Sequence, residues 1–109
     1  MVFLRAVPLR PNSVTSLPVS DTSIETTIYF DYTASQCSAF KIVYQGNGTI
    51  STDITETLID CSNRIEQLTC LEYNTWYSIN VMTLSKDNDA VPAKSSNITQ
   101  SGAWTCKYL

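Results

Sequence analysis

The amino-acid sequence predicts an all-β domain in which two sheets pack face to face, and three observations carry this prediction. β-branched and aromatic residues recur in short bursts, and these residue types favour strands. Over most of its length, the segment 68–83 alternates apolar and polar side chains, which is the period of a half-buried strand. Turn-forming residues separate the bursts, and no segment shows the period of a helix.

The size and charge of the chain limit what it can be. Its 109 residues are enough for one hydrophobic core and too few for two, and 43% of them are hydrophobic. The formal net charge is only -3, without a run of like charges, which argues against nucleic acid or an anionic membrane as the partner. No apolar run approaches the roughly 18 residues of a membrane-spanning helix, so we expect no direct insertion into a membrane.

The first three strands are short runs bounded by turn residues. The run at 14–19 contains Pro18, which a strand at the edge of a sheet tolerates. The next two runs each place alternate residues on one face of a strand. These inward faces are Ile24, Thr26, Ile28, Phe30 and Tyr32 in the second strand, and Phe40, Ile42 and Tyr44 in the third.

A hairpin and the remaining strands follow. The Asn47-Gly48 pair predicts a tight hairpin, because both residues readily adopt positive φ. Besides the alternating stretch, further strands are expected at 49–59, 65–69 and 95–104. In the last of these, Ile98 is expected to face inward, with Asn97 and Thr99 outward.

The four cysteines predict disulfides. A zinc site needs closely spaced cysteine or histidine ligands and a catalytic thiol needs a base, but the chain has no close cysteine pair and no histidine. Two disulfides would place the chain in an oxidising compartment, although the sequence leaves three pairings open. The sequons at Asn47 and Asn97 agree with a secreted or cell-surface setting, and Asn47, at a hairpin tip, is the better exposed glycan site. The four cysteines are Cys37, Cys61, Cys70 and Cys106.

The alternating stretch resembles the tyrosine corner of the fibronectin type III module. That family has the pattern Leu-x-Pro-x-Thr-x-Tyr-x-Val-x-Val where the chain crosses from its fifth strand to its sixth. Here the pattern stands as Leu71, Tyr73 in place of proline, Thr75, Tyr77, Ile79 and Val81. The resemblance implies that the Tyr77 ring lies against the core while its phenol bonds the corner backbone, with Leu71 and Phe30 as further anchors. Tyr73 is expected to pack in the corner.

The resemblance also implies an architecture, which is a seven-stranded immunoglobulin-like β-sandwich over residues 8–106. Residues 1–7 are then a leader or linker, and 107–109 begin a following linker. Phe30 stands where the family has a core tryptophan. The topology places Cys37 and Cys61 at one pole of the sandwich and Cys70 and Cys106 at the other, which implies the bridges Cys37–Cys61 and Cys70–Cys106.

Residues suited to catalysis are missing, whereas residues suited to contact are present. Without histidine, a Gly-rich phosphate loop or clustered carboxylates, we expect no enzyme, no metal and no cofactor. Strand parity places Trp76, Met82 and Val43 on an outer sheet face, where they form a candidate partner surface. Alternatively, Trp76 packs on the chain terminus or on an adjoining domain. By resemblance alone, Lys86 and Asp87 in the loop after the alternating strand are further candidates.

The expected function is protein–protein contact or spacing within a larger cell-surface receptor or adhesion protein. The partner is then another protein or a neighbouring domain of the same chain. A cytokine-receptor-type ligand-binding domain is the alternative, since it shares this sandwich, but the Trp-Ser-x-Trp-Ser signature is missing. A spacer without a partner and an accessory domain of a secreted hydrolase are further possibilities.

Overall fold

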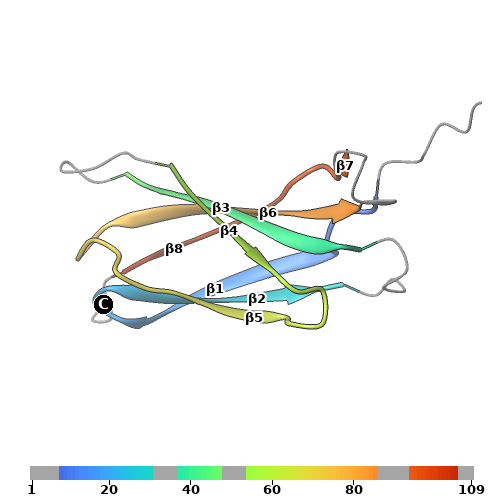
Figure 1. Ribbon diagram of the computed structural model, residues 1–109. Coiled ribbons are helices and arrows are strands. Elements are labelled where there is room, and N and C mark those ends of the chain that lie inside the picture. The colour runs from blue at the N-terminus through green and yellow to red at the C-terminus, as the bar shows by residue number, and fades with distance from the viewer. Residues whose placement is uncertain (1–7, 31–36, 48–53, 86–93, 106–109) are drawn as a thin grey trace, which may run out of the picture.

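The computed structural model describes residues 8–30, 37–47, 54–85 and 94–105, and within them the chain forms strands without helix (Figure 1). The strands are β1 (Ser13–Ser20), β2 (Ser23–Tyr29), β3 (Ala39–Gly46), β4 (Ile54–Ile59), β5 (Ile65–Leu68), β6 (Trp76–Ser85), β7 (Lys94–Ser95) and β8 (Thr99–Trp104). No helix long and apolar enough to cross a membrane occurs in these ranges.

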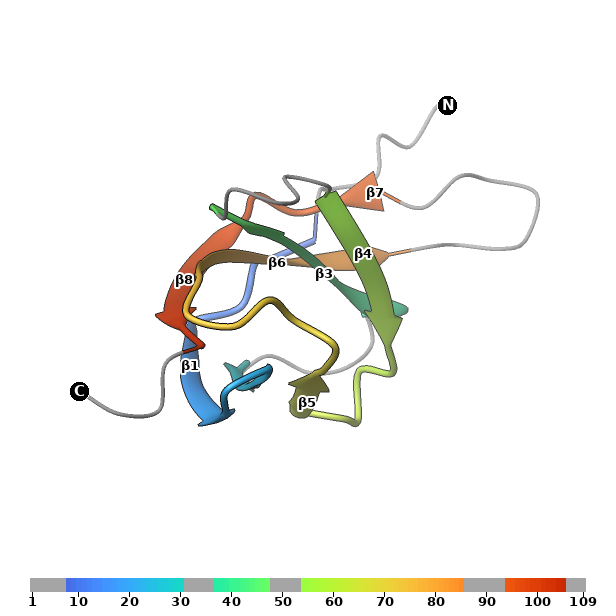
Figure 2. The same cartoon turned by 90° about the vertical axis from the view of Figure 1, so that its left-hand side faces the viewer.

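The strands form two antiparallel sheets, as the sequence predicts. One sheet has the order β1-β2-β5, and the other has the order β4-β3-β6, with β7 and β8 both paired to β6. β7 and β8 are therefore two segments of one interrupted strand, and the expected seven-stranded sandwich is confirmed. Figures 1 and 2 show the two layers facing each other, with β8 beside β1 at one open side. Across that side the Ser101 Oγ donates to the Ser16 Oγ at 2.9 Å.

The core lies between the sheets, and alternation decides which side chains enter it. In β2 the inward positions Ile24, Thr26 and Ile28 are buried, and Phe30 continues their face just after the strand. β3 and β6 supply the opposite layer of the core. Their buried side chains are Phe40, Ile42, Tyr77, Ile79, Val81 and Thr83. The predicted faces of these strands are confirmed, except at Tyr32, which lies outside the described residues.

The predicted tight hairpin at Asn47-Gly48 and the start of the strand predicted at 49 depend on residues 48–53, which lie outside the described residues, so both stay predictions. In the described part, β3 pairs with β4 from Phe40 opposite Ile59 to Gln45 opposite Ile54. Gly46 continues the pairing of β3 with β6, opposite Tyr77.

The predicted inward position of Ile98 is also wrong, since its side chain is 45% exposed. The last strand is interrupted between β7 and β8, and Ser96 takes the buried position instead. The Ser96 backbone N–H donates to the Thr83 carbonyl, and the Ser96 Oγ accepts from the Thr83 N–H and donates to the Asn97 carbonyl. The break thus satisfies buried backbone groups and turns Ile98 toward solvent.

Candidate functional site

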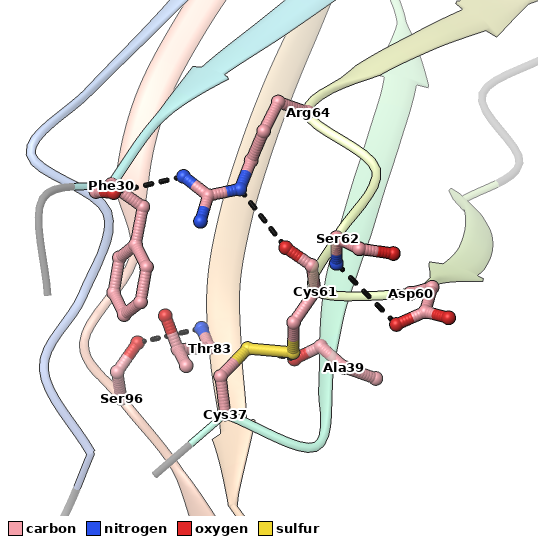
Figure 3. Close-up of a disulfide and its surroundings, with 9 residues drawn as sticks. All are labelled: Phe30, Cys37, Ala39, Asp60, Cys61, Ser62, Arg64, Thr83 and Ser96. Atoms are coloured by element: carbon pink, nitrogen blue, oxygen red, sulfur yellow. Dashed lines mark hydrogen bonds between the residues drawn. A yellow bond between two sulfur atoms is a disulfide. The ribbon is translucent and has the colours of Figure 1, made fainter. Parts of the chain in front are cut away.

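One pole of the sandwich is closed by a disulfide between Cys37, just before β3, and Cys61, just after β4 (Figure 3). The Cα atoms are 6.1 Å apart, within the range that a disulfide spans. Cys61 is buried and packs in the core cluster, with Cys37 at its margin. The predicted Cys37–Cys61 bridge is therefore confirmed, and it ties the start of β3 to the β4–β5 loop.

Arg64, which lies between β4 and β5, completes this pole, and no pattern in the sequence pointed to it. Its Nε donates to the Cys61 carbonyl at 2.9 Å, and its Nη1 donates to the Phe30 carbonyl at 2.8 Å (Figure 3). The guanidinium carbon also lies 5.4 Å from the Phe30 ring centroid and 5.6 Å from that of Phe40. The two rings meet edge to face, with centroids 5.3 Å apart. Two phenylalanines and a guanidinium thus occupy the region of the core tryptophan that the resemblance implies.

Replacing Arg64 by methionine is expected to lower the free energy of unfolding by about 2 kcal/mol, because two charge-assisted hydrogen bonds and the contacts with both rings are lost. Urea titration measures the change. Arg64→Lys is the matched control, since it keeps the charge without the planar fork, and its stability should lie between the two. Wild-type stability of Arg64→Met would show that the guanidinium does not hold this pole.

The opposite pole is built on Tyr77, as the resemblance implies. Its ring is buried, with 6% exposed, and its phenol oxygen accepts a 2.8 Å hydrogen bond from the Glu72 N–H. Leu71 is buried beside it, and its N–H donates to the Thr22 carbonyl in the β1–β2 turn. The predicted anchors Tyr77, Leu71 and Phe30 all lie in the core cluster.

Sequence reasoning missed the role of Gly46 at this pole. A Cβ atom at position 46 would lie 2.9 Å from the Cζ of Tyr77, closer than side chains tolerate. The glycine therefore leaves room for the tyrosine ring against β3. Only the folded chain shows that this glycine is paired with the corner tyrosine, so no signal in the sequence reveals its role.

The expected packing of Tyr73 in the corner is wrong, since its side chain is 65% exposed. Asn74 has a positive φ of 52°, so the chain turns there before β6 starts. Thr105 closes the corner from the far end of the described chain. Its Oγ1 donates to the Glu72 carbonyl and accepts from the Thr75 N–H.

Cys70 lies in the same corner, with a positive φ of 59°, and it is a free, exposed thiol in the structure. Cys106 lies outside the described residues, so the Cys70–Cys106 bridge stays a prediction. The hydrogen bonds of Thr105 bring the residue before Cys106 to this corner.

A hollow of about 370 Å³ opens beside the corner, lined by four hydroxyl-bearing residues together with Gly46, Cys70, Leu71 and Glu72. Burial raises the pKa of the Tyr44 phenol, and negative charge on Tyr77, Glu66 and Cys70 would raise it further. The Tyr44 phenol is therefore protonated at neutral pH. Among the described residues, no group of three or more His, Cys, Asp or Glu side chains could hold a metal ion.

The outer face of the five-stranded sheet carries the predicted contact residues. Trp76, at the start of β6, is 38% exposed, while Val43 and Met82 are half-buried on the same face. The predicted positions are confirmed, but a partner role for them stays a prediction. The loop candidates Lys86 and Asp87 lie outside the described residues.

The structure adds two apolar residues to this face. Ile54 and Leu58 of β4 are 62% and 63% exposed, and their register opposite Gln45 and Lys41 places them on the outer side. The alternation of this segment is too weak for the sequence alone to fix its register. Beside them, Lys41 forms a 3.4 Å ion pair with Glu56.

The two predicted glycan sites lie at different places in the fold. Asn47 follows β3 directly, and its N–H donates to the Trp76 carbonyl at 2.8 Å. Asn97 lies in the break between β7 and β8. Both residues are exposed, as a glycan requires.

The fold is similar to that of solved β-sandwich structures. The fibronectin type III domain FN5 of Drosophila Lar matches with a TM-score of 0.69 and 19% identity, covering 94% of this chain and 100% of that chain. A computationally redesigned β-sandwich protein matches with a TM-score of 0.71 and 17% identity, covering 94% of both chains. No protein-family model and no curated protein sequence matches the chain.

Proposed function

From the fibronectin type III fold of this chain, we propose that it is an extracellular module of a larger receptor or adhesion protein and that it makes a protein–protein contact. The Cys37–Cys61 disulfide is the observation that carries the extracellular assignment, because such bridges persist in oxidising compartments and are rare in the cytosol. The two exposed sequon asparagines, Asn47 and Asn97, support the same setting.

The contact is assigned to the outer face of the five-stranded sheet. We define the outer-face patch as Lys41, Val43, Leu58 and Met82. Lys41 is paired to Leu58 on one side and to Met82 on the other, so three of these side chains form a row across three strands. Apolar surface beside a charged pair is typical of the centre and rim of a protein interface.

The patch lies over close-packed core residues, and a buried side-chain oxygen lies beside it. The inward neighbours Phe40, Ile42 and Val81 have 0% exposure, so β3 and β6 present the patch on a close-packed core. Asn80, paired with Val43, has a buried Oδ1 without a hydrogen-bond partner among the described residues. Rotation of the Asn80 side chain would bring its Oδ1 to the surface, where a hydrogen-bond donor of a partner would satisfy it.

Site-specific photo-crosslinking tests this function. A benzophenone amino acid replaces Met82 in the full-length protein on intact cells, and the matched control places it at Gln67, exposed on the outer face of the other sheet. We expect position 82 to give a discrete crosslinked protein that is lost in Val43→Asp, while position 67 gives none. Crosslinks from position 67 alone would contradict the assigned face, and no crosslink from either position would favour a spacer.

A further inference from the structure

Asn47 and Trp76 are neighbours across two strands, and the outer-face patch does not include either of them. The Asn47 N–H donates to the Trp76 carbonyl at 2.8 Å, so the backbone places Asn47 beside the start of β6. Asn47 is exposed and is the acceptor residue of a sequon that Gly48 and Thr49 complete in the sequence. The acceptor residue of the sequon is thus the direct neighbour of Trp76, whose side chain is half-exposed.

Between the two residues lies a hollow of about 330 Å³, lined by Gln45, Gly46, Asn47, Trp76 and Ser78. This volume corresponds to about ten water molecules, at the ~30 Å³ that each takes in the liquid. It is enough for one sugar ring. Trp76 lines the hollow on one side, and the other lining residues that carry side chains are two amides and a hydroxyl. Such a lining suits a pyranose, whose C–H groups match an aromatic π-face and whose hydroxyls match amides.

The indole of Trp76 is held in place from its other side. Its Cζ2 lies so close to Gly102 of β8 that any side chain at that position would displace it. Trp104 meets it edge to face, with ring centroids 5.8 Å apart. Because β8 already holds the indole in place, a group that packs against the indole costs little further conformational entropy of the Trp76 side chain.

We propose that the first N-acetylglucosamine of a glycan on Asn47 packs against the indole of Trp76 and fills this hollow. The proposal rests on the proposed function only in that the chain must enter the secretory pathway. It assigns Trp76 a glycan in place of a protein partner, and it makes the Asn47 glycan part of the folded structure. Asn97 provides the contrast, because it precedes the Thr99 end of β8, whereas Trp76 is paired with Trp104 at the other end of that strand.

The test compares melting temperatures of the 109-residue chain secreted from mammalian cells behind a cleavable signal. Asn97→Gln leaves one sequon, and an endoglycosidase trims the glycan to a single N-acetylglucosamine. Thr49→Ala is the matched unglycosylated form, since it keeps both Asn47 and Trp76. We expect the single sugar to raise Tm by about 3–6 °C, and we expect this gain to vanish when the same pair is compared in a Trp76→Leu background.

A second measurement does not depend on the Trp76 variant. In the wild-type glycoform, ring-current shifts should move the proton resonances of the first sugar upfield, with nuclear Overhauser contacts to the Trp76 indole. An equal gain in both backgrounds, no gain, or sugar resonances at their free-glycan positions would overturn the proposal, as would an unmodified Asn47. Because the added signal supplies the secretory route, these outcomes are separate from finding the natural protein inside the cell, which would overturn only the proposed function.

Discussion

Replacing Cys37 and Cys61 together by alanine is expected to lower the free energy of unfolding by about 3–4 kcal/mol. The two residues are 24 positions apart, and in the chain-entropy account a loop of this size restricts the unfolded chain by that amount. The buried Cys61 adds packing that alanine only partly restores. Urea titration followed by tryptophan fluorescence measures the loss. The variant should also show a larger m-value, because its unfolded chain is less compact.

Ser62→Ala is the control for this experiment. Ser62 is an exposed neighbour of Cys61 in the same loop, so its replacement should change the unfolding free energy by no more than about 0.5 kcal/mol. A loss below about 1 kcal/mol in the double cysteine variant would contradict the bracing role given to the bridge.

Replacing Tyr77 by alanine is expected to cost about 3–5 kcal/mol of stability, because the change empties a ring-sized space between β3 and the corner. Tyr77→Phe separates the phenol from the ring. It leaves the Glu72 N–H without its 2.8 Å partner and should cost about 1–3 kcal/mol. Thermal unfolding followed by circular dichroism measures both losses.

The exposed Tyr73 in the same corner provides the matched control, and Tyr73→Phe should be close to neutral. If Tyr77→Phe were equally neutral, the hydrogen bond to Glu72 would not anchor the corner. If Tyr77→Ala cost as little as Tyr77→Phe, the ring would not be part of the core.

The fold could be predicted because its signals are local and repeated. Alternation in β2, β3 and β6 fixed which side chains enter the core, and the pattern ending in Val81 located the corner. The pole of the Cys37–Cys61 bridge followed from strand order once the sandwich was assumed. These features depend on side-chain period and topology, both of which a sequence displays.

The predictions failed where the backbone leaves the strand period. Tyr73 precedes a residue with positive φ, and Ile98 lies in a break between two strand segments. Strict alternation of inward and outward side chains does not continue through such irregularities, so it assigns these two residues to the wrong face. Glycine is common in turns, yet Gly46 makes room for the ring of Tyr77, which is 31 positions later in the chain. Contacts between residues so far apart leave no periodic signal in either segment.

Arg64 shows the same limit at the other pole. A polar residue between two strands is normally solvated, and only the folded chain shows its guanidinium bonded to the Phe30 carbonyl, 34 residues away. Only part of the outer-face patch could be predicted from the sequence. Val43 and Met82 follow from the alternation of their strands, whereas Leu58 required the register of β4, which the weak alternation of that segment obscures.

The most direct test is a peptide map, without reduction, of the protein isolated from its natural source. The account predicts that the peptides of Cys37 and Cys61 are joined in nearly every molecule, and the same map would show whether Cys70 is joined to Cys106. Recovery of Cys37 and Cys61 as free, alkylated thiols from native protein would contradict the claim that this sandwich is a bridged module of the extracellular space.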